Sequence, residues 1–159
     1  MRTAEQIISD FNLIKHPEGG FYRETYRSNQ EIDWNGKHNI STCIYYLLTS
    51  DTFSAFHRIR QDEIWHFYEG STIEMHLISP QGNHKIVEIG KDFEKNQVPQ
   101  FVVPAGYWFA AVVKGEYALV GCTVSPGFDF NDFEIANRTL LQIQYPELKE
   151  IIEIFTRQD

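Results

Sequence analysis

The chain has 159 residues, 42% of them hydrophobic and 23% charged, which is ordinary for a globular protein and predicts a single domain over residues 1–159. A net charge of −8 without a cluster of lysine or arginine argues against nucleic-acid partners, because a phosphate backbone needs a basic face. No apolar run is long enough to span a bilayer, and the N-terminus lacks the apolar core of a signal peptide, which favours a cytoplasmic protein that does not bind membranes.

The first predicted element is a short helix over residues 3–12. Thr3 and Gln6 have the spacing of a capping box, and apolar residues follow at helical spacing. The segment 16–20 ends any helix, because Pro17 lacks a backbone donor and the two glycines after it allow positive φ. This segment is either only a turn or a turn that leads a strand into the lining of a cavity.

Alternating residues and turn signals then predict a series of short strands. They are expected at residues 20–27, 41–49, 53–59, 63–68, 72–79, 84–89, 98–103, 108–114 and 117–124. Residues 29–39 are polar, with Gly36 placed for the turn of a hairpin. Cys43 and Cys122 fall in apolar strands and are expected to be buried free thiols, which fits a reducing compartment.

Near the C-terminus the period of the pattern changes from strand to helix. One helix is expected over residues 131–141, capped by Asn131 or Asp132, and a second begins at Pro146 and continues to Phe155. Many short strands with helices at both ends predict a mainly β fold, a double-sheet jelly roll with short N- and C-terminal helices.

The strongest chemical signal lies in the two strands on either side of a polar break at residues 60–62. His57 belongs to the alternating pattern of the first strand, and Glu63, Trp65 and Phe67 share one face of the second. We predict that the two strands form a hairpin and that His57 and Glu63 point into the same aromatic-lined cavity. His76 and His84 fall on mixed faces that are expected to be exposed, and no role is predicted for either.

The spacing of these residues resembles the motifs of the cupin superfamily. The first cupin motif has two histidines, a glutamate and a glycine, and the corresponding residues here are His57, Ile59, Glu63 and Gly70. The second motif has a proline, a glycine, a histidine and an asparagine, and the corresponding residues are Pro104, Gly106, Phe109 and Val113. Two of the four metal ligands implied by the resemblance are therefore replaced by Ile59 and Phe109.

Longer segments narrow the resemblance to a small cupin family of unknown function. They are HPEGGFYRETYRS (residues 16–28), DEIWHFYEG (62–70), VVPAGYWFAA (102–111) and CTVSPGFDFNDFE (122–134). The resemblance implies a jelly-roll barrel with a cavity between its two sheets. It also implies a homodimer, with which the mixed face of residues 20–27 is compatible.

One hypothesis from the superfamily is a metal-dependent enzyme with a reduced ligand set. Catalytic metals usually take at least three protein ligands, so His57 and Glu63 alone would hold a divalent ion only weakly. His66 points away under strict alternation, and His16 is a candidate only if its loop folds over the cavity. We therefore predict no metal or other cofactor.

A second hypothesis is metal-free acid–base chemistry, as in cupins that epimerise sugar nucleotides. His57 would act as the base and Glu63 would orient it. A tyrosine would supply the acid, and the sequence leaves four candidates open, namely Tyr22, Tyr26, Tyr45 and Tyr46. The plainer alternative is that His57 and Glu63 are simply a satisfied polar pair inside the barrel.

A third hypothesis is a binding module without catalysis. Aromatic side chains at Trp65, Phe67, Phe101, Trp108 and Phe109, together with Arg23, would line the pocket and suit a planar or sugar-like ligand. The function we favour is binding of a small molecule in the barrel. If the protein also acts as a catalyst, we expect metal-independent isomerase or epimerase chemistry on a sugar-nucleotide-like or planar ligand.

Overall fold

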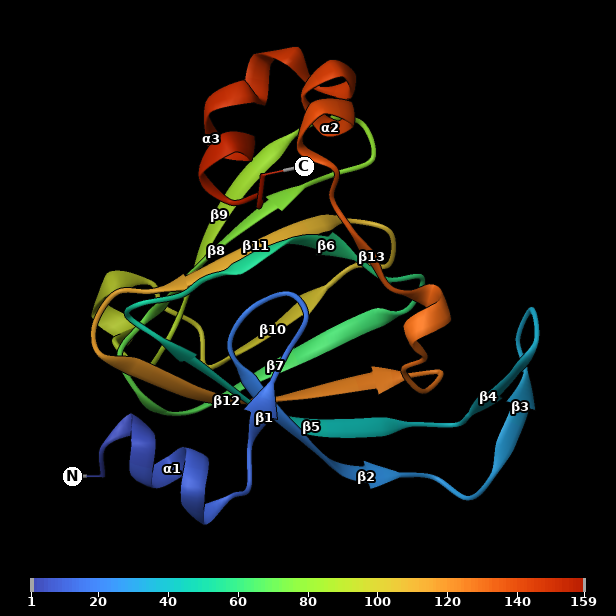
Figure 1. Ribbon diagram of the computed structural model, residues 1–159, viewed down its shortest axis with the longest axis vertical. Coiled ribbons are helices and arrows are strands. Elements are labelled where there is room, and N and C mark those ends of the chain that lie inside the picture. The colour runs from blue at the N-terminus through green and yellow to red at the C-terminus, as the bar shows by residue number, and fades with distance from the viewer. Residues whose placement is uncertain (1, 159) are drawn as a thin grey trace.

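The computed structural model describes residues 2–158 and contains two antiparallel sheets that face each other (Figure 1). The six-stranded sheet has the order β1 (Ile14–Lys15), β2 (Phe21–Arg27), β5 (Thr42–Thr49), β12 (Tyr117–Ser125), β7 (Asp62–Gly70) and β10 (Gln100–Val103). The five-stranded sheet has the order β13 (Glu134–Ile135), β6 (Ser54–Arg58), β11 (Trp108–Val113), β8 (Ile73–Ile78) and β9 (His84–Ile89). This arrangement is the predicted double-sheet jelly roll.

Short helices and one projecting hairpin surround the two sheets (Figure 1). The α-helices are α1 (Ala4–Asp10), α2 (Arg138–Gln144) and α3 (Lys149–Ile154), and the 3₁₀ turns are η1 (Phe93–Lys95), η2 (Phe130–Asp132) and η3 (Pro146–Leu148). The strands β3 (Glu31–Asp33) and β4 (Lys37–Asn39) pair only with each other and extend away from the body. No helix in the described part of the chain is long and apolar enough to cross a membrane.

The predicted N-terminal helix is confirmed together with its capping box. The Gln6 backbone N–H donates to Thr3 Oγ1 at 3.2 Å, and the Thr3 N–H donates to Gln6 Oε1 at 2.9 Å. Such a cap is worth about 1 kcal/mol, which matters for a helix of only two turns. Ile7 is fully buried against Leu47 and its neighbours, so the apolar stripe anchors the helix to the outer face of the six-stranded sheet.

The core is divided by the sheets into an interior and two outer layers. Trp65, Met75 and Val120 belong to the cluster between the sheets. On the outer face of the five-stranded sheet, Phe56 and Ile152 belong to a second cluster that holds the C-terminal helices. Successive residues of a strand therefore serve different layers, as the period of two predicts.

The prediction that the strands of residues 53–68 form a hairpin is wrong, because these strands do not pair with each other. Strand β6 pairs with β11 and β13, whereas β7 pairs with β10 and β12 in the opposite sheet. The chain crosses from one sheet to the other at residues 59–61, where the Ile59 carbonyl accepts from the Gly106 N–H at 3.0 Å. The polar break at residues 60–62 therefore belongs to the connection between the two sheets and not to a hairpin turn.

The helix predicted over residues 131–141 begins later in the structure. Asn137 is its N-cap and accepts from the Leu140 N–H at 2.9 Å. Residues 134–135 instead form strand β13, which pairs with Arg58 and His57 of β6. The apolar spacing that indicated a helix here belongs to an extended segment that lies on the edge of the sheet.

Candidate functional site

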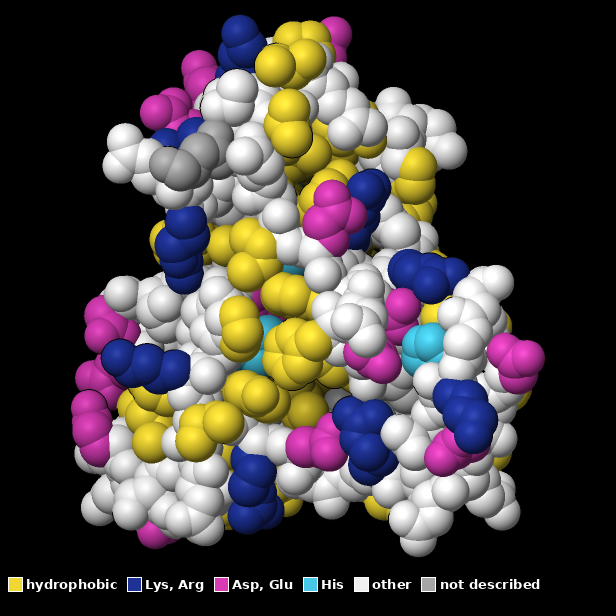
Figure 2. Space-filling model, turned by 45° about the vertical axis from the view of Figure 1, so that its right-hand side comes forward, with side chains coloured by type: hydrophobic (Ala, Val, Ile, Leu, Met, Phe, Trp, Pro, Cys, Tyr) yellow, Lys and Arg dark blue, Asp and Glu magenta, His cyan; other side chains and the backbone are white. Residues whose placement is uncertain are grey.

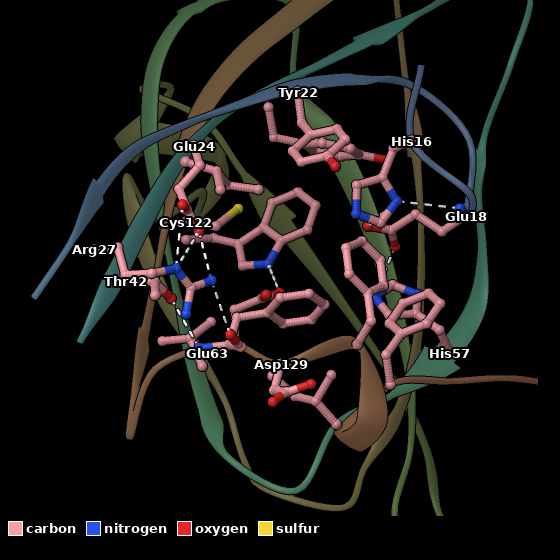
Figure 3. A pocket seen from close by; sticks show the side chains of 18 residues that line it. His16, Glu18, Tyr22, Glu24, Arg27, Thr42, His57, Glu63, Cys122 and Asp129 are labelled. Atoms are coloured by element: carbon pink, nitrogen blue, oxygen red, sulfur yellow. Dashed lines mark hydrogen bonds and ion pairs between the residues drawn. The ribbon is translucent and has the colours of Figure 1, made fainter. Parts of the chain in front are cut away.

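A cavity of about 470 Å³ opens between the two sheets (Figure 3). Its acidic and basic lining residues are His16, Glu18, Glu24, Arg27, His57, Glu63 and Asp129, and its aromatic lining residues are Tyr22, Tyr46, Trp65, Phe128, Phe130 and Phe133. Ile44, Ile59, Val124, Thr42 and Cys122 complete the lining. The molecular surface in Figure 2 shows hydrophobic side chains gathered in the middle of one face, with histidine atoms visible between them.

The loop that precedes β2 places Glu18 inside the cavity. Gly19 and Gly20 have φ of +112° and +77°, and a Cβ on Gly19 would lie 2.0 Å from the Phe53 carbonyl oxygen. Only glycine allows the loop to lie this close to the neighbouring strand. The Glu18 carbonyl accepts from the Ala55 N–H at 2.9 Å, so the loop is held along β6 and the Glu18 side chain turns inward.

Glu18 is the carboxylate that pairs with His57. His57 Nε2 lies 2.7 Å from Glu18 Oε2, and His57 Nδ1 lies 2.7 Å from the Ala55 carbonyl oxygen. Because a carbonyl can only accept, Nδ1 carries a proton, and the close contact at Nε2 requires a second proton between the two side chains. Ser54 Oγ also donates to Glu18 Oε2 at 2.6 Å.

The electrostatics of this pair favour the ionised state of both partners. Burial alone would lower the pKa of His57, but the charge and hydrogen bond of Glu18 raise it above its ordinary value. Burial alone would raise the pKa of Glu18, but the charges of His57 and His16, with the hydrogen bonds from His57 and Ser54, bring it below its ordinary value. The pair is thus an imidazolium with a carboxylate.

Glu63 lies on the facing sheet and stands apart from that pair. Trp65 Nε1 donates to Glu63 Oε2 at 2.6 Å, and the other carboxyl oxygen has no hydrogen-bond partner among residues 2–158. Burial, with a further contribution from the charge of Glu18, raises the pKa of Glu63 to about 7. Glu63 can therefore bind or release a proton near neutral pH, as a general acid or base must.

His16 lines the cavity beside Glu18, with its Nδ1 3.3 Å from Glu18 Oε1. Its Nδ1 accepts from the Glu18 backbone N–H at 3.1 Å, and burial lowers the pKa of the imidazole. The ring packs edge-on against Tyr22 at 4.7 Å between centroids. Figure 3 shows its second nitrogen on the side of the ring that faces the cavity, where it can donate to a ligand. The loop that carries His16 therefore belongs to the site and is more than a turn.

The predicted site residues are only partly brought together. His57, Glu63 and Trp65 line the cavity, and Phe109 lies directly behind the His57 ring at 4.0 Å between centroids. Trp108 lies on the other face of β11, under Arg58, because neighbouring residues of a strand point in opposite directions. The prediction that Trp108 and Phe109 share a pocket is therefore wrong.

Phe67 and Phe101 belong to the core between the sheets but not to the cavity lining. Phe67 is one strand repeat beyond Trp65, about 7 Å farther along β7, where other core side chains fill the barrel. Lys91 lies over the Phe67 ring and Lys85 over the Phe101 ring. The structure thus places both rings in the packed half of the barrel, which corrects the predicted lining.

Arg23 lies outside the cavity, and Arg27 takes the place predicted for it. The register of β2 against β5 shifts between Glu24 and Tyr26, so a β-bulge interrupts the alternation. Before the bulge Tyr22 and Glu24 face inward, and after it Arg27 does. Arg23 instead lies over the Tyr45 ring on the outer face.

Two of the four candidate tyrosines line the cavity, and the other two lie outside it. Tyr22 and Tyr46 line the cavity, whereas Tyr26 is 56% exposed and Tyr45 stacks on Phe11 of the outer layer. The Tyr46 hydroxyl donates to the Gly19 carbonyl at 2.6 Å, and burial raises its pKa well above 10. Tyr46 is therefore a structural group that holds the glycine loop.

Two expectations for the other histidines have different outcomes. His66 points away from the cavity and contacts Thr123 Oγ1 at 3.1 Å, as strict alternation predicts. His76 was expected to be exposed but is buried, with its ring nitrogens 2.7 Å from Glu74 and 2.9 Å from His84. Neither residue reaches the cavity.

The donor set does not fit the metal that the cupin resemblance implies. Ile59 and Phe109 replace two ligands, and both nitrogens of His57 are engaged by Ala55 and Glu18. A metal would need a free lone pair on His57 and at least a third ligand. Among residues 2–158, no group of three or more His, Cys, Asp or Glu side chains is arranged to hold a metal ion.

Several cavity residues were missed by sequence reasoning. The sequence patterns place Glu18 in a turn and Phe133 in the predicted helix of residues 131–141, and they assign no role to Phe128 or Phe130. The one available signal was the pair of glycines after Glu18, which allows a close approach of loop to strand. No comparable signal marks the three phenylalanines, which reach the cavity from the loop of residues 127–133 that contains the 3₁₀ turn η2.

Solved structures with this architecture come from distant organisms. Protein SO0799 from Shewanella oneidensis superposes with a TM-score of 0.95 at 37% identity, covering all of both chains. A hypothetical protein from Leishmania major superposes with a TM-score of 0.93 at 32% identity, covering 99% of this chain and 100% of that one.

A more remote likeness shows the fold alone. Oxalate decarboxylase from Bacillus subtilis superposes with a TM-score of 0.61 at 13% identity over 91% of this chain, which matches only 37% of that enzyme. One description of that enzyme names Mn(II) centres, which are a property of the decarboxylase.

Sequence comparison agrees with the structural likeness. The yeast "Uncharacterized protein YML079W" from Saccharomyces cerevisiae is 36% identical over 148 residues, which cover 82% of this chain and 73% of the yeast protein. The family model described as "Cupin superfamily (DUF985)" matches residues 5–136. With its two facing sheets and its cavity between them, the chain belongs to this DUF985 family of the cupin superfamily.

Proposed function

We propose that the protein binds a small molecule in its barrel cavity and moves protons on it without a metal, as an isomerase or epimerase does. One observation carries the proposal: two buried acid–base centres from opposite sheets line one cavity. Glu63 is one centre and the His57–Glu18 pair is the other (Figure 3). Groups with perturbed pKa values that face a common cavity are the usual signature of proton-transfer sites.

The roles follow from the protonation states. Ionised Glu63 accepts a proton from a carbon next to a carbonyl group of the ligand, so that the C–H bond breaks and the electron pair moves into the ligand. The proton held between His57 Nε2 and Glu18 Oε2 is then delivered from the opposing sheet, which forms the new C–H bond. The ligand changes configuration but keeps its charge.

Hydrogen exchange tests this proposal directly. A panel of small chiral carbonyl compounds is incubated with the protein in deuterated water, and loss of the carbon-bound proton is followed by NMR. We expect exchange with a compound that binds, and a fall of about 100-fold or more in Glu63→Gln, because general acid–base catalysis contributes at least that much. Glu69→Gln is the matched control, since Glu69 lies on the same strand and pairs with Arg2 outside the cavity.

Two results would contradict the proposal. Exchange that is equally fast in Glu63→Gln would remove the residue on which the mechanism rests. Binding of a carbonyl compound without any exchange would leave the second candidate, a binding module without catalysis. That alternative is favoured by one specific observation, since both nitrogens of His57 are already engaged by protein groups.

A further inference from the structure

The charged groups that line the cavity are mostly neutralised by one another. Glu18 pairs with His57, as described above. Glu24 accepts from Arg27 at 2.6 Å to Nη2 and 3.1 Å to Nε. Among residues 2–158, no ion pair forms at two of the lining carboxylates, Glu63 and Asp129, although the charge of Asp129 contributes to raising the pKa of His38.

Arg27 has little capacity left for a ligand. Besides its two bonds to Glu24, its Nη1 donates to Asn39 Oδ1 at 2.7 Å and its Nη2 to the Phe128 carbonyl at 3.0 Å. All three nitrogens of the guanidinium are therefore used, and its charge is opposed by a carboxylate in direct contact. Within residues 2–158, each basic side chain of the cavity lining already contacts a carboxylate, which argues against a ligand with a phosphate or carboxylate group and hence against the sugar-nucleotide class.

The two unpaired carboxylates both have an oxygen available to a ligand. Glu63 is 9% exposed and has one carboxyl oxygen without a hydrogen-bond partner among the described residues, at the wall of the cavity. Asp129 accepts from the Asn131 N–H at 2.8 Å through Oδ1, and no donor in the described part of the chain bonds to its Oδ2. For Glu63, which is nearly buried, a carboxyl oxygen with no partner is costly unless a ligand or solvent satisfies it, whereas Asp129 is only partly buried.

Aromatic rings line the same cavity as these two carboxylates. Phe128, Phe130 and Phe133 contact one another at 4.9 to 6.1 Å between ring centroids and form one side of the cavity. Tyr22 and Trp65 line it from β2 and β7. Ring faces attract cations, and several rings around unpaired carboxylates are the chemistry that recognises an organic ammonium group.

We propose that the ligand of this cavity is a small organic cation, with its ammonium group bound to Asp129 Oδ2 and further attracted by the charge of Glu63, and with its apolar part packed against the aromatic rings. This proposal rests on the proposed function in placing the ligand in the same cavity. It goes further in naming the class of compound, and it excludes anionic ligands such as sugar nucleotides.

Three probes of one size test the charge preference. Benzylammonium, benzyl alcohol and benzoate share a ring and differ in charge, and their binding is measured by isothermal calorimetry and by quenching of tryptophan fluorescence. We expect benzylammonium to bind about tenfold more tightly than benzyl alcohol, the size of effect that partly buried ion pairs and cation–π contacts supply. Benzoate is expected to bind most weakly of the three.

Matched variants locate the effect in the cavity. Asp129→Asn keeps a side-chain oxygen that can accept from the Asn131 N–H, and Glu63→Gln keeps one that can accept from Trp65 Nε1, so each removes charge with little change of shape. We expect each variant to lose most of the preference for benzylammonium while its affinity for benzyl alcohol stays the same. Asp10→Asn, on the exposed side of α1, is the control and should keep the preference.

The outcomes separate this proposal from the proposed function. Benzoate that binds as tightly as benzylammonium, no binding of benzylammonium at millimolar concentration, or a preference unchanged in both Asp129→Asn and Glu63→Gln would overturn the cation proposal. Hydrogen exchange on an anionic compound would overturn it as well, yet would support proton transfer. A cation preference without exchange on any compound would keep the ligand class and remove the catalysis.

Discussion

At the scale of single residues, Glu63 ties the chemistry of the cavity to the stability of the fold. Its pKa is about 7 in the folded protein against 4.5 for a free side chain, so the folded state holds the proton more tightly than the unfolded state. Below about pH 4.5 both states are protonated and the group has no effect. As the pH rises toward 7 the unfolded state ionises first, and stability falls.

We therefore expect Glu63→Gln to be more stable than the natural protein at alkaline pH. The gain relative to acidic pH is about 3 kcal/mol at most, since each pKa unit corresponds to about 1.4 kcal/mol. Urea unfolding of both proteins near pH 4.5 and above pH 8 measures it, with Glu69→Gln as the control. If the natural protein and Glu63→Gln show parallel pH profiles, Glu63 ionises in the folded protein as easily as in water.

The residue scale also shows where sequence reasoning succeeds and where it fails. His57 and Glu63 could be identified because each lies on a strand, where the period of two fixes the face of a side chain. Glu18 could not, because it lies in a loop whose course depends on a contact with Phe53 and Ala55 about 36 residues away in the chain. Local patterns carry no information about which distant strand a loop will follow.

At the scale of elements, the segment 127–135 covers one side of the cavity and is held by one buried carboxylate. Asp132 Oδ2 lies 2.7 Å from His38 Nε2 and accepts from Gln61 Nε2 at 3.0 Å, and Arg60 donates to Oδ1 at 3.3 Å. The contact with Asp132 raises the pKa of His38. These bonds tie the segment to the β3–β4 hairpin and to the crossing between the sheets.

Replacing this carboxylate should loosen the segment without unfolding the barrel. We expect Asp132→Ala to cost about 2 to 4 kcal/mol, because it leaves His38 and Gln61 without their buried partner. Hydrogen exchange measured by mass spectrometry should increase in residues 127–135 and in the β3–β4 hairpin. Asn131→Ala, an exposed neighbour, is the control, and equal exchange in the two variants would mean that Asp132 does not hold the segment.

Elements could be predicted from the sequence better than their partners. The spans of most strands and of helix α1 follow from alternation and caps. The pairing of β6 and β7 with opposite sheets, and the bulge between Glu24 and Tyr26, do not. A short polar break is compatible with a hairpin or with a crossing, and the strands that pair with β6 and β7, namely β11 and β12, come much later in the chain. The bulge makes Arg27 rather than Arg23 face the cavity, and no residue type in this strand marks where the bulge lies.

At the scale of the whole molecule, hydrophobic side chains remain exposed along one edge of the six-stranded sheet. Ile14 on β1 is 60% exposed and Tyr26 on β2 is 56% exposed, and Ile32 and Ile40 on or beside the β3–β4 hairpin are 44% and 43% exposed. Edge strands and projecting hairpins with apolar side chains are common sites of subunit contact. The resemblance to cupins implies a homodimer, and we propose that the second copy of the chain covers this edge.

If the proposed dimer forms, a single substitution in its interface should lower the molecular mass measured in solution from that of a dimer toward that of one chain. Ile32→Asp places a charge in the apolar contact, and because Ile32 makes no core contact in one chain, the fold itself should be unaffected. Light scattering after size exclusion should give twice the chain mass of 18.6 kDa for the natural protein and a shift toward that mass for the variant. Ile143→Asp, at an even more exposed apolar position on α2, is the control. A natural protein that remains monomeric at micromolar concentration, or a dimer broken equally by Ile143→Asp, would show that this edge is not the interface.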